Sequence, residues 1–229
     1  MTRIETFMAG HGRASRAAYW VARSAVAGFT RLWTRLEVEG AEHIPTTGPF
    51  VLAPVHRSNM DTPISSCLTK RRLRFMGKDS LWKHQPAAWV LSTLGGFPVS
   101  RGTADREALR RCIAVLEAGE PLVLFPEGER KTGPVVQPLF DGAAYVALRG
   151  KAPIVPVGIG GSEAVMPKGA KFIHPCKVHV VVGPPITHAA MAEDAKRVPR
   201  EAVHQVTAEL HETLQRLFDE AQRRVYPPR

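Results

Sequence analysis

A histidine and an aspartate lie close together after the first strongly apolar run of this 229-residue chain. His56 directly follows Phe50–Val55 and opens the segment His-Arg-Ser-Asn-Met-Asp, which ends at Asp61. A histidine at a strand end can act as a general base near neutral pH. Asp61 could fix its tautomer only if the chain turns, because five residues of a regular helix rotate by about 500°. Without such a turn, His56 would be an ordinary loop histidine.

Two further segments end in charges that could bind an anion. Gly95–Gly102 is rich in glycine and carries Arg101, and a guanidinium suits bidentate phosphate binding. Leu122–Lys131 is an apolar run followed by an acid, a glycine and two cations. Its Glu127 could hydrogen-bond a hydroxyl or a neighbouring backbone group, and Arg130 could hold a phosphate. Solvated surface turns are the alternative for both segments.

The elements that must position these residues alternate between strands and helices. Continuous apolar runs predict strands buried on both faces; they lie at 50–55, 73–76, 122–125, 154–159 and 178–182. Helices are predicted at 103–118, 141–148 and 198–224, the last with an apolar stripe for core packing. This alternation predicts an α/β domain with a mostly parallel, largely buried sheet flanked by helices. Ligands then bind beyond the carboxyl ends of the strands, where the candidate segments begin.

A proline within the fourth apolar run suggests one wall of a site. Pro156 lies inside 154–159, and proline removes a donor from the strand ladder. We therefore expect this strand to be interrupted at Pro156 and to bend away from its neighbour.

The first 36 residues predict a separate amphipathic helical region. From about 13 to 36, five arginines share one sector of a helical wheel, and apolar side chains including Phe29 and Leu32 fill the opposite sector. This profile is typical of a helix that lies in a membrane interface, and packing against the chain's own domain is the alternative. We expect a membrane-associating region at 1–36 and the α/β domain at 37–229.

Composition narrows the function classes. The formal net charge of +10 favours polyanionic partners such as anionic lipid headgroups or phosphorylated substrates. Zinc-finger spacing and an aromatic RNA-binding signature are absent from the sequence, so a nucleic-acid partner is not expected. The three cysteines are scattered, His174 and His179 lack a third obvious ligand, and no metal is expected. No run reaches the roughly 18–20 apolar residues of a spanning helix.

In their order, these segments resemble the glycerophospholipid acyltransferases, specifically the PlsC-like 1-acylglycerol-3-phosphate acyltransferases. The matching blocks are His56 to Asp61, Gly95 to Arg101, Phe125 to Arg130 and Val155 to Val157, and Phe75–Leu81 and Asp141–Ala143 also look like the family. The likeness covers roughly residues 36 to 185. The chain departs from the family pattern at Ser100, Glu129 and Lys131.

The resemblance implies direct transfer of a fatty acyl group from acyl-CoA or acyl carrier protein to the free hydroxyl of 1-acylglycerol-3-phosphate, giving phosphatidic acid. His56 would be the general base and Asp61 its orienting carboxylate. Arg101, Arg130 and Lys78 would bind the acceptor phosphate, and Glu127 and Gly128 would shape the glycerol site. No cofactor beyond the thioester co-substrate is implied.

The same resemblance implies a peripheral or monotopic enzyme on the cytoplasmic face of the cell membrane, with an anionic membrane surface and a lysophospholipid as partners. Transfer to another acceptor, such as a glycolipid or glycerol 3-phosphate, stays open. A hydrolase using the same histidine and a non-catalytic membrane adaptor are the more distant alternatives.

Overall fold

The computed structural model describes residues 13–78, 82–84, 88, 91–92, 94–99, 106–189 and 198–227. These residues form one seven-stranded sheet in the order β1-β7-β6-β2-β5-β3-β4. The strands are β1 Glu37–Glu39, β2 Val51–Pro54, β3 Arg74–Lys78, β4 Gly96–Val99, β5 Leu122–Val123, β6 Ile154–Gly160 and β7 His179–Val182. The helices are α1 Arg13–Thr34, η1 Ala41–His43, α2 Asp61–Ser66, α4 Arg106–Glu117, α5 Gly142–Arg149, α6 Ser162–Val165 and α7 Arg200–Val225.

The sheet is mostly parallel, as the alternating pattern predicted. β6 and β7 pair antiparallel, whereas the other strand pairs are parallel. β2 lies between β6 and β5, and all four of its residues are buried. The carboxyl ends of β2 and β5 therefore lie side by side, and the two segments that follow them are His56 to Asp61 and Leu124 to Lys131.

Two details of the sheet differ from expectation. Gly96–Val99 of the glycine-rich segment forms β4, an edge strand paired with β3, which is not among the predicted strands. Pro98 has no backbone N–H to donate. It is tolerated here because one side of an edge strand has no neighbouring strand to pair with. The interruption predicted at Pro156 is also wrong: β6 is continuous and fully buried, and Pro156 stays in register with Ala53 while its carbonyl accepts from Gly183 N.

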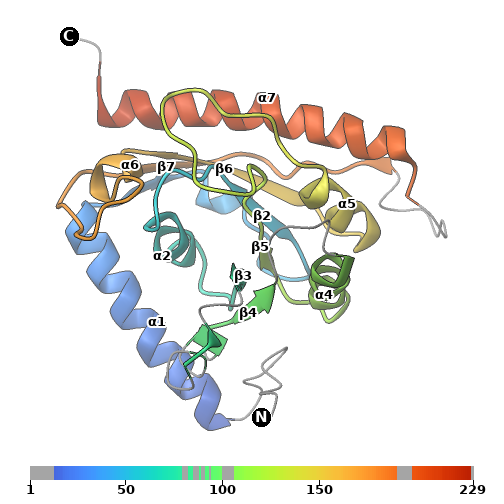
Figure 1. Cartoon of the computed structure of the whole chain (residues 1–229), viewed down its shortest axis with the longest axis horizontal. Helices are drawn as coiled ribbons and strands as arrows, with labels where there is room; N and C mark the ends of the chain where they lie inside the picture. The colour runs from blue at the N-terminus through green and yellow to red at the C-terminus, as the bar shows by residue number, and fades with distance from the viewer. Residues whose placement is uncertain are drawn as a thin grey trace.

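The long helix α7 lies across the sheet and packs on β6 and β7 (Figure 1). Its predicted apolar stripe is confirmed as core, because Val206, Leu210, Leu214, Leu217 and Ala221 are all buried. Glycines in β6 let the backbones of β6 and α7 approach each other closely. A Cβ on Gly158 would lie 2.3 Å from the Leu217 carbonyl group, so this position has no room for a side chain. α7 is thereby held close to the sheet that carries the candidate site.

The N-terminal helix α1 packs on α2, and its Tyr19, Ala27, Thr30 and Thr34 are buried. Two arginines of its basic sector contact the protein rather than facing away from it. Arg31 Nη2 donates to Cys67 O at 2.8 Å, and Arg23 Nη2 donates to Ser66 O at 2.9 Å and also to Thr69 O. These carbonyls lie at the end of α2 and carry partial negative charge, which attracts the guanidinium groups.

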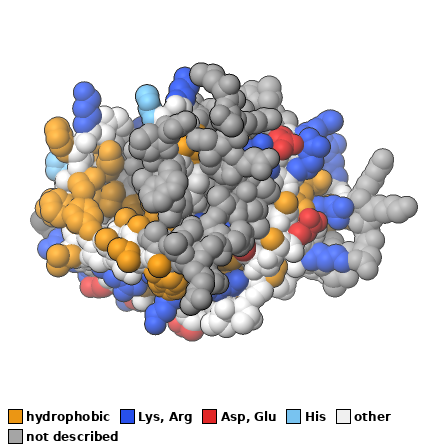
Figure 2. Space-filling view, turned by 90° about the horizontal axis from the view of Figure 1, so that it is seen from below, with side chains coloured by type: hydrophobic (Ala, Val, Ile, Leu, Met, Phe, Trp, Pro, Cys, Tyr) orange, Lys and Arg blue, Asp and Glu red, His pale blue; other side chains and the backbone are white. Residues whose placement is uncertain are grey.

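The opposite sector of α1 is apolar and exposed. Leu32 is 83% exposed, Val21 is 72% exposed and Phe29 is 48% exposed. Figure 2 shows hydrophobic side chains gathered on the left of the view, the side on which Figure 1 places the end of α1 that leads into β1. Among the described residues, no helix combines the length and the apolar character needed to cross a membrane.

Candidate active site

His56 and Asp61 meet in a tight turn beyond the carboxyl end of β2. His56 Nδ1 lies 3.0 Å from Asp61 Oδ2, so the turn that the pairing required is present. The chain leaves β2 at Pro54, makes a hydrogen-bonded turn in which Asp61 N donates to Ser58 O, and begins α2 at Asp61. A carboxylate acceptor at Nδ1 places the imidazole proton on that nitrogen. Nε2 is then the nitrogen that can take a proton from a substrate.

The carboxylate of Asp61 is buried and fixed by the backbone of the same turn. Its Oδ2 accepts from Arg57 N at 2.6 Å and from Ser58 N at 2.7 Å, besides contacting His56. Hydrogen bonds from backbone amides favour the charged form of a carboxylate. A fixed anion beside an imidazole both orients the ring and stabilises the imidazolium that forms when the ring accepts a proton.

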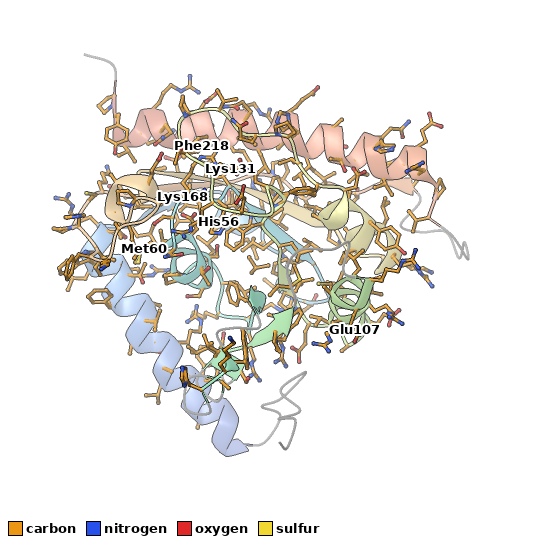
Figure 3. The ribbon with its side chains drawn as sticks, viewed as in Figure 1. His56, Met60, Glu107, Lys131, Lys168 and Phe218 are labelled. Carbon is orange, nitrogen blue, oxygen red and sulfur yellow. The ribbon has the colours of Figure 1, made fainter. Side chains whose placement is uncertain are left out.

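The imidazole ring of His56 is held on its other side by Phe125. The two rings stack with centroids 3.9 Å apart and planes 21° apart. The His56 side chain is only 13% exposed, so it contacts solvent over a small area. Figure 3 shows His56 in the middle of the molecule, between α2 and the segment that bears Lys131. The ring is thus oriented by a stack and a carboxylate before any substrate binds.

Glu127 is fully buried next to the backbone of His56, and its predicted role in shaping the glycerol site stays a prediction. Its carboxylate is paired with Arg57, whose Nη1 lies 2.9 Å from Oε1 and 2.7 Å from Oε2. The same carboxylate accepts from His56 N at 3.1 Å and from Gln137 N at 3.1 Å. Through these contacts the buried carboxylate of Glu127 fixes the backbone of His56.

The loop that follows Glu127 is joined to the backbone of His56. Lys131 N donates to His56 O at 2.8 Å, and this brings the half-buried Arg130 next to the histidine segment. Lys131 Nζ pairs with Glu129 Oε1 at 2.9 Å. Glu129 and Lys131 are two of the positions at which this chain departs from the family pattern. The positive charge of Lys131 therefore partly neutralises the carboxylate of Glu129.

Gly128 occupies a backbone conformation that favours glycine. Its φ is +72°, and a Cβ there would lie 2.7 Å from the ring of Phe140. The glycine therefore allows both the turn after Glu127 and the close cover by Phe140. Its predicted contact with the glycerol of an acceptor stays a prediction.

The segment that holds this geometry matches a known family model. Residues 35–160 match the model described as Acyltransferase, and this range spans more than half of the chain. The chain belongs to the acyltransferase family. The match begins just before β1 and ends with β6, so it includes both His56 and Asp61.

Individual relatives of this acyltransferase carry more specific names. The 1-acyl-sn-glycerol-3-phosphate acyltransferase of Bacillus subtilis is 27% identical over 80% of this chain and 91% of its own length. The alpha form of the mouse enzyme of that name is 26% identical over 70% of this chain and 58% of its own length. The crystal structure of PlsC from Thermotoga maritima superposes with a TM-score of 0.73 at 24% identity, covering 92% of this chain and 83% of that one. The last likeness concerns the fold.

Two predicted phosphate ligands of the acyltransferase are only partly placed. Arg101 lies outside the described residues, so its predicted convergence with His56 stays a prediction. Lys78 is the last residue of β3, whose carboxyl end lies beside that of β5. The backbone of Lys78 is therefore on the same sheet edge as the histidine segment.

Sequence reasoning missed Arg57 as a functional residue, although it lies inside the His56 to Asp61 segment. An arginine after a histidine reads as a solvated surface charge, yet Arg57 is fully buried. Its guanidinium donates to Glu127 and stacks 4.8 Å from the centre of the Phe218 ring on α7. The carboxylate partner lies far away in the sequence, so the sequence contains no local signal of the pair.

An apolar cavity opens beside α2 close to the acidic member of the pair. Its volume is about 200 Å³, and it is lined by Tyr19, Arg23, Thr62, Pro63, Ser66, Phe75, Leu91, Leu94 and Gly96. Thr62, which follows Asp61 in α2, is one of the lining residues. Burial raises the pKa of the Tyr19 phenol, and the phenol is therefore neutral.

Proposed function

We propose that this acyltransferase moves a fatty acyl group from an acyl thioester to the free hydroxyl of 1-acylglycerol-3-phosphate, giving phosphatidic acid. The observation that carries the proposal is the fixed pair of His56 Nδ1 and Asp61 Oδ2 at 3.0 Å beyond the end of β2. The names of the Bacillus and mouse relatives support the choice of acceptor. Acyl-CoA and the acylated form of acyl carrier protein are both thioesters, and either can be the donor in the chemistry below.

The reaction uses the imidazole first as a base and then as an acid. His56 Nε2 takes the proton of the acceptor hydroxyl while the oxygen attacks the thioester carbonyl carbon. The tetrahedral intermediate then breaks its carbon–sulfur bond, and the thiolate receives the proton from Nε2. Asp61 remains ionised throughout and stabilises the imidazolium. No acyl-enzyme is formed, and the proton count balances.

The acceptor phosphate is expected to bind near Arg130. This arginine follows the turn at Gly128 and precedes Lys131, whose amide is bound to His56 O. A phosphate bound by Arg130 would thus lie close to the His56 imidazole. Lys78, the last residue of β3, and Arg101, which lies outside the described residues, are the other two proposed phosphate ligands.

The apolar cavity beside α2 is proposed to accept an acyl chain. It extends from Thr62, next to Asp61, toward Tyr19 on α1 and Phe75 on β3. A hydrocarbon chain in this cavity would lie beside α2, the helix that begins at Asp61. Burial of each methylene contributes about 0.8 kcal/mol, so the cavity would contribute to binding of the substrate.

A test of the acceptor compares several substrates with the purified chain. Labelled acyl-CoA and acyl carrier protein are each offered with 1-acylglycerol-3-phosphate, glycerol 3-phosphate or a phosphate-free monoacylglycerol. We expect the first acceptor to have a kcat/KM at least about 10-fold above that of the phosphate-free one, because charge-assisted contacts are worth about 1.5–3 kcal/mol. A higher value with glycerol 3-phosphate would favour the alternative acceptor.

Variants show whether the arginines bind phosphate. Arg130→Ala and Arg101→Ala should each lower kcat/KM for 1-acylglycerol-3-phosphate more than for the phosphate-free acceptor. Arg149→Ala, at the exposed end of α5, is the matched control. Equal losses on both acceptors would instead make the arginine structural.

We further propose that α1 docks this acyltransferase on a lipid surface through its exposed apolar sector. Val21, Phe29 and Leu32 are exposed on the side of α1 opposite the arginines that bind α2. Trp20, 45% exposed with its ring 5.5 Å from the Arg23 guanidinium, lies among the arginines and is not part of this apolar sector. The acceptor is itself a membrane lipid, so a peripheral position at the cytoplasmic face would bring the site to its substrate.

Exchange of two α1 residues should weaken vesicle binding. For Phe29→Ser/Leu32→Ser, we expect the affinity for phosphatidylcholine–phosphatidylglycerol vesicles to fall at least about 10-fold, because each buried side chain contributes about 1.5–3 kcal/mol. The measurement is sedimentation with vesicles. Tyr226→Ser, an exposed aromatic at the end of α7, is the control and should bind as the wild type does. Unchanged binding of the double variant would refute docking through α1.

A further inference from the structure

The buried guanidinium of Arg57 depends on a loop that lies between the site and α7. Besides its pair with Glu127, Arg57 donates through Nε to Gly133 O at 3.2 Å and through Nη2 to Val135 O at 3.1 Å. Both carbonyls belong to residues 133–137, a part of the chain without helix or strand. We call this part the clamp loop. Because Arg57 is fully buried, a shift of these carbonyls would leave its charge with fewer acceptors.

The opposite side of the clamp loop is fastened to α7 by two side chains. Gln215 Oε1 accepts from Val136 N at 2.8 Å, and Gln215 Nε2 donates to Pro134 O at 3.1 Å. His211 Nε2 lies 3.0 Å from Val136 O. The side-chain amide of Gln215 thereby satisfies a donor and an acceptor of the loop at once. The loop is neither helix nor strand, so its backbone N–H and C=O groups need other partners. The side chains of α7 supply these partners and thereby fix the position of the loop.

The clamp loop also reaches the carboxylate that holds the histidine. Gln137 N donates to Glu127 Oε1, and Glu127 Oε2 accepts from His56 N. The contacts therefore run from α7 to the clamp loop, then to Arg57 and Glu127, and from these to the backbone of His56. Figure 3 shows Phe218 on the side of α7 that faces the region of His56, and the Phe218 ring lies 4.8 Å from the Arg57 guanidinium.

We propose that Gln215, assisted by His211, is a positioning residue for acyl transfer. It touches neither substrate nor the reacting atoms. By fixing the clamp loop it fixes Arg57 and Glu127, and through them the direction in which His56 presents Nε2. The inference rests on the proposed function, since His56 is its endpoint. A small displacement of a base relative to its substrate can lower a rate by about 10²-fold, so a distant fastening residue can matter to catalysis.

Replacement of Gln215 by an isosteric apolar side chain tests the proposal. In Gln215→Met the side chain keeps its length but loses both hydrogen bonds to the clamp loop. We expect kcat to fall about 10-fold while KM stays within about 2-fold, because the change acts on the step that uses His56 and not on binding. His211→Phe removes the second fastening contact and should lower kcat by about 3-fold. These values are measured by acyl transfer to 1-acylglycerol-3-phosphate.

The matched control is another glutamine on the same helix. Gln222 Oε1 accepts from Gly161 N at 3.0 Å, so Gln222→Met also removes a contact between a side chain of α7 and the backbone. Its midpoint of thermal unfolding should also fall, but its kcat should stay near the wild-type value. Equal kcat values for the two variants would overturn the proposal.

A double variant shows whether Gln215 acts through the buried pair. In Glu127→Gln the side chain keeps a single acceptor oxygen and can no longer hold Gln137 N and His56 N through two oxygens, so adding Gln215→Met should lower kcat by less than it does in the wild type. Additive effects would mean that Gln215 acts by another route, which contradicts the proposal. If the wild type itself transfers no acyl group to any acceptor, the proposed function fails. If it does, a Gln215→Met variant that behaves like Gln222→Met contradicts the positioning role alone.

Discussion

His56→Ala should abolish most acyl transfer while leaving the chain folded. Loss of a positioned general base lowers a rate by about 10²–10⁴-fold, so we expect kcat to fall at least about 10²-fold. The imidazole is held by Asp61 and by the Phe125 ring, and both partners remain in the variant. The rate is followed with a labelled acyl thioester and 1-acylglycerol-3-phosphate.

The control for this variant is a histidine away from the site. His174→Ala changes an exposed residue in the segment between α6 and β7 and should leave the rate unchanged. Vesicle binding and the unfolding midpoint of His56→Ala should match those of the wild type. A His56→Ala variant with normal turnover would remove the histidine from the mechanism, and with it the proposed chemistry.

Arg57→Met should strongly destabilise the folded chain. It leaves the buried carboxylate of Glu127 without its cation, and breaking a buried pair in this way costs about 3–5 kcal/mol. For a chain of this size, that loss lowers the unfolding midpoint by roughly 6–20 °C. The cavity left by the guanidinium beside Phe218 acts in the same direction.

A second substitution should restore part of this stability. In Arg57→Met/Glu127→Gln the uncompensated charge is gone, while the amide oxygen can still accept from a backbone donor, His56 N or Gln137 N. Thermal unfolding of the single and double variants measures the recovery. Arg110→Met removes a cation from an exposed pair with Glu107 and should shift the midpoint by less than about 3 °C. A double variant no more stable than Arg57→Met would show that the charge of Glu127 is not what destabilises it.

The order of strands and helices and the position of the base were determined by the sequence itself. Apolar runs such as Phe50–Val55 and Ile154–Ile159 predict buried strands because burial on both faces leaves no polar positions. A parallel sheet gathers its strand ends at one edge, so His56 could be expected there from its place after such a run. The pairing of His56 with Asp61 was conditional on a tight turn after the strand, and the structure contains that turn. These inferences rest on local pattern and general topology.

Only the tertiary structure decided which charges face each other. The sequence gives no sign that Arg57 pairs with Glu127, because contacts between residues so far apart depend on the neighbouring order of β2 and β5. The same holds for Arg23 and Arg31, whose partners are the carbonyls at the end of α2. A charged side chain in a sequence reads as solvated, since burial without a partner is costly. Its partner, and therefore its role, becomes visible only when the fold brings distant segments together.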